Sequence, residues 1–282
     1  MPARSEYDRD RLTSMRKSTK EYTDANRVAW NEAAARHAAH NNAALFAAAR
    51  DPAFVSFEGE ILQTLHRLGV AGKHIIQLGC NNGRETLSLR NLGATRCVGV
   101  DAAAEFLAHG RELIRIADAA DQVELVEADI YDLPAEFHAA FDMVLVTIGV
   151  ISWMPDLQAF FDVVRSLLKP GGQLLMEEMH PLLLMYEQDV DSGVSSPRYS
   201  YFSGEIREET TGLDYYGHES YDSAPNYSFM HRLDEILMAG IGSDLKLERF
   251  IELDHDISNF CSDLEHSPIK PPLGFVMVMS AA

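Results

Sequence analysis

Short apolar runs and helically spaced apolar positions alternate along the middle of the chain. The runs have the length of strands, and they lie at 73–78, 96–101, 123–129, 141–147 and 173–180. Between them, apolar residues recur at steps of three and four, which is the spacing of a helix with one buried face. Strands that alternate with helices in this way form right-handed βαβ units. The pattern therefore predicts an α/β fold with a parallel sheet covered by helices on both faces.

Further elements are predicted on either side of this region. Helical spacing covers 22–41 and 54–68 ahead of the first strand. The first of these helices is rich in alanine, a strong helix former, and its buried face belongs either to an ordinary docking helix or to a lid over a ligand site. After residue 230, a helix at 233–239 and strands at 245–251 and 273–279 resume the pattern.

The stretch from 181 to 230 interrupts the alternation. Six of the ten tyrosines lie between Tyr199 and Tyr227. We predict an insertion after the fifth strand, with short antiparallel strands. Its aromatic surface serves either as the cover of a ligand pocket or as the contact of a homodimer.

Composition excludes several kinds of partner. Acidic residues outnumber basic ones by 43 to 24, a formal charge of −19, so nucleic acid or an anionic membrane surface would be repelled. Cys80, Cys97 and Cys261 have neither the spacing of a zinc site nor the even number of a disulfide framework. The polar N-terminus and the lack of a long apolar run predict a cytoplasmic protein.

The turn after the first strand is the first candidate for chemistry. Residues 77–83 read Gln-Leu-Gly-Cys-Asn-Asn-Gly and lead directly into a helical stretch. A glycine-containing turn between a strand and a helix is where nucleotides bind at the carboxyl edge of a parallel sheet. Gly79 and Gly83 suit a plain structural turn equally well. Whether the turn binds a nucleotide is therefore judged from the residues at the ends of the following strands.

Acidic residues end the next two strands. Asp101 follows Gly79 at close to the spacing at which a carboxylate accepts hydrogen bonds from a ribose diol. Asp129 ends the third strand, where a carboxylate can accept from the exocyclic amine of a purine. The alternative for each is a helix N-cap or turn residue. Two successive acidic strand ends suit a ligand that contains a ribose and an adenine.

Together these motifs resemble the class I S-adenosylmethionine-dependent methyltransferases, in the branch that acts on small molecules. The resemblance covers about residues 55–180, and it rests on segments in the family's order and spacing, which are 77–83, 99–101, 127–130, 141–144 and 167–172. It implies S-adenosyl-L-methionine as the cofactor. It also implies a Rossmann-like, mostly parallel sheet of seven strands in the order 3-2-1-4-5-7-6, with the last strand reversed.

The resemblance divides the chain into four regions. These are an N-terminal arm and helical lid (1–54), the cofactor-binding core (55–180), an acceptor-covering insertion (181–230) and the C-terminal completion of the sheet (231–282).

Cofactor-binding residues follow from their places in the family's motifs. They are Gly79, Cys80, Asn81, Gly83, Asp101, Ala102, Phe106, Asp129, Ile130 and Thr147. The chain departs from the family's commonest loop, Gly-x-Gly-x-Gly, in carrying Asn81 at the middle glycine. Asparagine tolerates a left-handed backbone, so we expect the loop to keep its course. Thr147 stands where metal-dependent catechol methyltransferases carry an acid, so no metal ion is predicted.

The reaction needs few catalytic groups, because a methyl on a sulfonium is already activated. The enzyme mainly holds the acceptor in line and excludes water, and a base helps only when the acceptor starts protonated. His180 and Glu178 at the end of the fifth strand are the candidates. Alternatively, His180 belongs to the turn that leaves the strand, and Glu178 orients a neighbour without moving a proton. Candidates on the lid and acceptor side are Tyr22, Trp30, His37, His218 and His231.

The sequence thus predicts an S-adenosylmethionine-dependent methyltransferase acting on a small-molecule metabolite. The chain after the fourth strand lacks Asn-Pro-Pro-Tyr and Asp-Pro-Pro-Tyr, which argues against nucleic-acid and glutamine N-methyltransferases. Two other classes stay open. One is a non-catalytic or repurposed S-adenosylmethionine-binding protein. The other is an NAD-dependent dehydrogenase, which the second acidic strand end disfavours.

Overall fold

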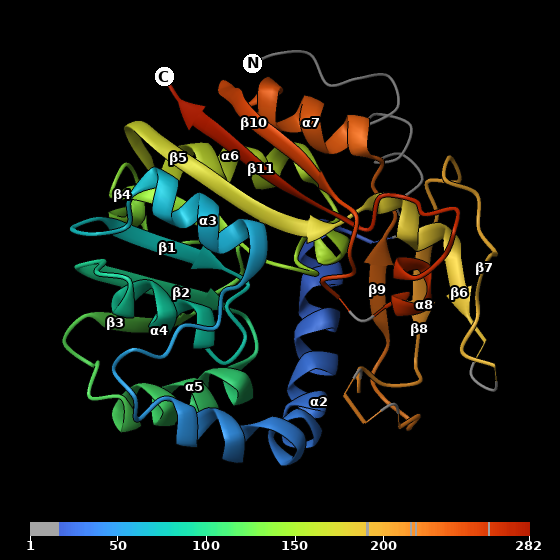
Figure 1. Cartoon of the computed structure of the whole chain (residues 1–282), viewed down its shortest axis with the longest axis horizontal. Helices are drawn as coiled ribbons and strands as arrows, with labels where there is room; N and C mark the ends of the chain where they lie inside the picture. The colour runs from blue at the N-terminus through green and yellow to red at the C-terminus, as the bar shows by residue number, and fades with distance from the viewer. Residues whose placement is uncertain (1–16, 190–191, 215, 218, 259) are drawn as a thin grey trace.

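The computed structural model describes residues 17–189, 192–214, 216–217, 219–258 and 260–282. Its centre is a seven-stranded sheet in the order β3-β2-β1-β4-β5-β11-β10 (Figure 1). The strands are β1 (His74–Leu78), β2 (Arg96–Asp101), β3 (Val123–Glu127), β4 (Phe141–Val146), β5 (Leu168–Met179), β10 (Leu245–Leu253) and β11 (Gly274–Ala281). Because β6 to β9 lie outside this sheet, the order is the predicted 3-2-1-4-5-7-6.

Strand directions also agree with the prediction. The first five strands pair in parallel, whereas β11 runs antiparallel to both β5 and β10. The carboxyl ends of β1 to β5 therefore meet along one edge of the sheet. Residues that follow those strands, far apart in the sequence, are brought together at this edge.

Two apolar cores hold helices against the two faces of the sheet. On one face lie α3 (Gly59–Leu68), α4 (Arg84–Asn91) and α5 (Ala104–Ile116). On the other face lie α6 (Leu157–Leu167) and α7 (Leu233–Gly242). The helix predicted at 54–68 begins only at Gly59, because the residues before it run extended and bury Phe57 in the first core.

The long helix α2 (Thr19–Ala48) passes the carboxyl edge of the sheet (Figure 1). It begins three residues before the predicted start, because Ser18 and Glu21 form a capping box in which each side chain binds the other's backbone N–H. One side of α2 packs on α5, and another packs on the insertion strand β9. The helix thus lies between the core and the insertion.

The insertion contains two antiparallel hairpins, as the sequence predicts. The first pairs β6 (Tyr186–Gln188) with β7 (Ser195–Pro197), and the second pairs β8 (Ile206–Glu209) with β9 (Asn226–Phe229). A short helix, α8 (Ser262–Glu265), precedes the last strand. Among the described residues, no helix has both the length and the apolar character needed to cross a membrane.

Candidate functional site

The loop between β1 and α4 makes two left-handed turns at glycine. Gly79 has φ +68°, and a Cβ there would lie 2.5 Å from Cγ2 of Val150, so a side chain is excluded by sterics as well as by backbone conformation. Gly83, with φ +71°, is the N-cap of α4, and its N–H donates to the carbonyl of Cys80 at 2.8 Å. The Cys80 thiol points into the core, where burial raises its pKa well above the ordinary value.

Asn81 adopts the left-handed backbone expected from the sequence. Its φ is +50°, and its side-chain Oδ1 accepts a hydrogen bond from the N–H of Asn82 at 2.8 Å. The Asn81 N–H donates to Oδ2 of Asp101 at 2.8 Å. Asparagine therefore replaces the family's middle glycine and keeps the course of the loop.

Asp101 links the ends of β1 and β2. Besides the Asn81 amide on Oδ2, its Oδ1 accepts from the N–H of Ala103 at 2.9 Å, across the intervening Ala102. Burial raises the pKa of this carboxyl, and the backbone N–H groups oppose that effect. Each carboxylate oxygen has a second lone pair, so the group can still accept from a ligand.

Asp129 lies two residues beyond β3 and contacts α2. Its Oδ1 accepts from the N–H of Tyr131 at 3.0 Å, and its Oδ2 accepts from the hydroxyl of Thr23 on α2 at 2.5 Å. The neighbouring Ile130 is buried in the core. Nothing in the sequence pattern pairs Thr23 with Asp129, because the contact depends on how α2 docks.

A buried polar chain joins β1 to β4 beneath the loop. Thr86 on α4 donates to Oε1 of Gln77 at 2.6 Å, and the Gln77 amide donates to the hydroxyl of Thr147 at 3.1 Å. Gln77 is fully buried, so each of its polar ends has a partner. This chain fixes Thr147 at the carboxyl end of β4.

Aromatic rings from several elements meet at helix α2. Trp30 on α2 lies 5.2 Å from Trp153, which follows β4, and 6.0 Å from Phe106 on α5, both measured between ring centroids. His37, one turn along from Ala33 on α2, lies 5.2 Å from Phe106, and its Nε2 donates to the carbonyl of Leu213 in the insertion at 2.7 Å. Burial lowers the pKa of His37. The structure thus brings together three predicted residues, Trp30, His37 and Phe106.

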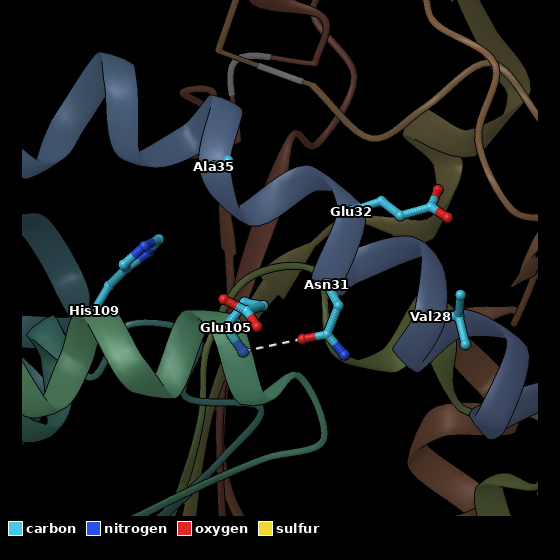
Figure 2. A pocket seen from close by; sticks show the side chains of 6 residues that line it. All are labelled: Val28, Asn31, Glu32, Ala35, Glu105 and His109. Atoms are coloured by element: carbon cyan, nitrogen blue, oxygen red, sulfur yellow. Dashed lines mark hydrogen bonds between the residues drawn. The ribbon is translucent and has the colours of Figure 1, made fainter.

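A surface pocket of about 430 Å³ lies between α2 and α5 (Figure 2). Its lining is Val28, Asn31, Glu32, Ala35, Glu105 and His109. Among these residues, Oδ1 of Asn31 accepts from the N–H of Glu105 at 3.0 Å and joins α2 to the first turn of α5. No pattern in the sequence predicts this pocket, because its lining comes from two helices that are far apart along the chain.

Glu178 is buried, with 3% of its surface exposed, and it binds backbone N–H groups. Oε2 accepts from Gly149 and from Met179, each at 2.9 Å, and Oε1 accepts from Ile151 at 3.0 Å. Burial raises its pKa to about 7, while these N–H groups act in the opposite direction. The carboxylate thus contacts the segment after β4.

His180 lies in the turn that leaves β5. Its Nδ1 accepts from the N–H of Leu182 at 3.2 Å, so in the neutral ring the proton is on Nε2. That nitrogen is 3.4 Å from Oε1 of Glu252 on β10. Burial lowers the pKa of the ring, and Glu252 opposes the shift. His180 and Glu178 contact different elements.

The remaining predicted residues lie on the insertion side of the site. Tyr22 on α2 is buried against Tyr227 and Phe229, with centroid distances of 5.0 and 5.2 Å. His231 is buried, and its Nε2 donates to the carbonyl of Met154 at 2.7 Å. It lines a narrow cavity that Glu178 also borders. His218 lies outside the described residues. Across the described ranges, no three His, Cys, Asp or Glu side chains are grouped to hold a metal ion.

Comparison with known proteins identifies the domain that carries this geometry. Residues 75–172 match the family model described as "Methyltransferase domain". Over these residues the chain is similar to a methyltransferase domain. The matched residues include the loop from Gly79 to Gly83, both acidic strand ends and Thr147.

Relatives of this methyltransferase domain differ in what their names say they act on. A ubiquinone biosynthesis O-methyltransferase of Xanthomonas euvesicatoria pv. vesicatoria is 31% identical over 114 residues, which are 40% of this chain and 46% of that protein. A tRNA U34 carboxymethyltransferase of Cellvibrio japonicus is 28% identical over 114 residues, 40% of this chain and 35% of that protein. The chain therefore covers less than half the length of these curated relatives.

A solved structure extends the likeness in fold beyond the matched domain. A putative S-adenosylmethionine-dependent methyltransferase from Listeria monocytogenes superposes with a TM-score of 0.59 at 15% identity. The superposition covers 79% of this chain and all of that one, 100%. At this identity the likeness concerns the fold alone.

Proposed function

We propose that this protein transfers a methyl group from S-adenosyl-L-methionine to a small-molecule acceptor. One observation carries the proposal: the Gly79–Gly83 loop, Asp101 and Asp129 lie at adjacent carboxyl ends of β1, β2 and β3 within a methyltransferase domain. Parallel α/β sheets bind their ligands at this edge.

The residues at this edge fit the cofactor because they have hydrogen-bond acceptors that the protein itself does not use. Asp101 uses one lone pair of each oxygen on the backbone, which leaves acceptors for two ribose hydroxyls. Asp129 can accept from the adenine amine beside its contact with Thr23. Gly79, Cys80, Asn81 and Gly83 would pass beneath the aminocarboxypropyl arm, with Phe106 near the base. When bound, the cofactor supplies an activated methyl on a sulfonium.

A small acceptor is favoured by charge and by enclosure. The formal charge of −19 opposes the approach of a nucleic-acid backbone. Helix α2 and hairpin β8–β9 cover the carboxyl edge, with Trp30, Tyr22 and His231 buried or half-buried at the contacts. Such a cover excludes water from the sulfonium and suits a compact, partly apolar molecule.

General-base catalysis by His180 is a prediction that depends on a change in the hydrogen bonds of its ring. Nδ1 of the ring accepts the Leu182 N–H, and Nε2 carries the proton, so the ring must turn or lose a contact before it can accept a proton. The geometry therefore favours a positioning role for His180 in the turn. In-line placement of the acceptor supplies most of the rate enhancement in this proposal.

Transfer of labelled methyl groups tests the function directly. Purified protein is incubated with S-adenosyl-L-methionine labelled in its methyl group and with two acceptor pools, a set of small phenols, amines and acids, and a transfer RNA preparation. We expect label in the small-molecule pool only. Label in the RNA pool would contradict the acceptor class. Adenosyl binding without any transfer would favour a repurposed binding protein.

A further inference from the structure

The segment 147–154 contacts β1 and the loop after it, helix α2 and the region of the insertion. At its start, the Thr147 hydroxyl accepts from Gln77 of β1. The side chain of Val150 fills the space where Gly79 would otherwise carry a Cβ, 2.5 Å from that position. At its end, Trp153 packs on Trp30 of α2, and the Met154 carbonyl accepts from His231, which directly follows the insertion.

The segment itself has little regular structure to hold it in place. It follows β4 and contains one short 3₁₀ turn, Ile151–Trp153, and Gly149 has φ +93°. A Cβ added at Gly149 would meet nothing within 4 Å, whereas the side chains of Val150, Ile151 and Met154 are buried in the core. Packing thus holds the end of the segment, and hydrogen bonds from outside the segment hold the backbone at Gly149 and Ile151.

Those hydrogen bonds converge on Glu178. Its two oxygens accept the N–H groups of Gly149 and Ile151 within the segment and of Met179 at the end of β5. A carboxylate has only acceptors, so it suits a place where three N–H donors meet. With 3% of its surface exposed, the group has no competing water at the surface to replace these contacts.

We propose that Glu178 is a positioning residue that holds segment 147–154, so that the cofactor loop, the α2 lid and the insertion close on one another. The inference rests on the proposed function for its effect on turnover. Its structural part stands independently, because the contacts of segment 147–154 can be measured without any reaction.

Glu178→Gln tests the role with little change of shape. One oxygen is replaced by an NH₂ group, which must then face a backbone N–H, so at least one of the three contacts is lost and becomes repulsive. Glu178→Asp serves as a second variant, since it keeps the charge but draws the carboxylate back. Glu187→Gln, on the exposed strand β6, is the matched control.

The structural readout uses the two tryptophans of the chain, Trp30 and Trp153, which face each other across the lid contact. Near-ultraviolet circular dichroism reports their contact, and amide exchange of a peptide spanning 147–154 reports the Gly149 and Ile151 N–H groups. We expect Glu178→Gln to weaken the tryptophan signal and to speed amide exchange in this segment by roughly tenfold or more. Unchanged exchange and an unchanged tryptophan signal in both variants would overturn the proposal, with or without activity.

The kinetic readout separates positioning from proton transfer. Once an acceptor is known, a positioning role predicts a KM for the acceptor that rises by about tenfold or more, with a smaller change in kcat. A loss of kcat at unchanged KM, with wild-type exchange, would assign proton transfer to Glu178 instead. If the wild-type protein transfers no methyl group, the proposed function fails, and the exchange experiment still decides the role of Glu178.

Discussion

At the scale of single residues, the site is built from backbone N–H groups that bind acidic and amide side chains. Asp101 holds the loop after β1, Asp129 binds the lid, and Glu178 holds the segment after β4. The sequence could predict Asp101 and Asp129, because their spacing after strands is regular. It could not predict the amide partners of Glu178, because alternation along a strand fixes the face of a side chain but not which loop it meets.

Replacing Asp101 should weaken cofactor binding. Asp101→Ala removes the acceptors proposed for the ribose and leaves the N–H groups of Asn81 and Ala103 without their carboxylate. We expect S-adenosylhomocysteine to bind more weakly by about 2–3 kcal/mol, measured by titration calorimetry. Asp121→Ala, at an exposed turn, should leave the affinity as it is. Equal affinities for the two variants would remove Asp101 from the ribose role.

Asn81 allows a test of its left-handed backbone. Asn81→Gly and Asn81→Ala both lose the side-chain contact to the Asn82 N–H, but only alanine opposes a φ of +50°. The alanine variant should therefore be the less stable of the two by about 1 kcal/mol in denaturant unfolding. If the two variants unfold at the same denaturant concentration, the loop does not require the left-handed conformation.

At the scale of elements, strands and core helices could be predicted from periodicity, whereas the docking of α2 could not. The five parallel strands were expected close to their observed places, and the reversed β11 follows from the family order. Helix α2 docks through contacts between residues that no local pattern connects. These contacts are Thr23–Asp129, Asn31–Glu105 and Trp30–Trp153. Long-range docking depends on complementary surfaces, which a single sequence does not display.

Asn26 tests whether α2 and the insertion form one cover. Its side chain donates to the carbonyl of Tyr227 at 2.9 Å and accepts from the N–H of Tyr227 at 2.7 Å, both buried. Asn26→Ala should cost about 1–3 kcal/mol per orphaned group and speed amide exchange in β8 and β9. Asn41→Ala, at a half-buried position on the same helix, should change exchange there little. Wild-type exchange in Asn26→Ala would mean that the hairpin is held independently of the lid.

At the scale of the whole molecule, acidic residues outnumber basic ones, and acidic side chains are also buried at the carboxyl edge of the sheet. Glu177 is buried beside Glu178 on β5, and burial, with the Glu178, Glu85 and Glu58 carboxylates, raises its pKa from 4.5 to about 8. The folded protein therefore keeps a proton on Glu177 that the unfolded chain releases above about pH 4.5. Stability from this group is fully present below that pH and is lost as the pH rises through about 8.

Glu177→Gln should remove this dependence on pH. The variant should gain stability relative to the wild type as the pH rises from about 5 to about 8, by roughly 1–3 kcal/mol in denaturant unfolding. Glu187→Gln should give a difference that does not change with pH, because its side chain is exposed. A Glu177→Gln difference that is constant over the same range would show that Glu177 is ionised in the folded protein.

A calorimetric titration tests most directly whether the carboxyl edge of the sheet binds an adenosyl sulfonium cofactor. S-adenosylhomocysteine, S-adenosyl-L-methionine and NAD are titrated separately into the wild-type protein. We predict saturable binding of both adenosyl ligands at one site per chain, with NAD weaker by at least about tenfold. Tighter binding of NAD, or no binding of either adenosyl ligand, would contradict the account.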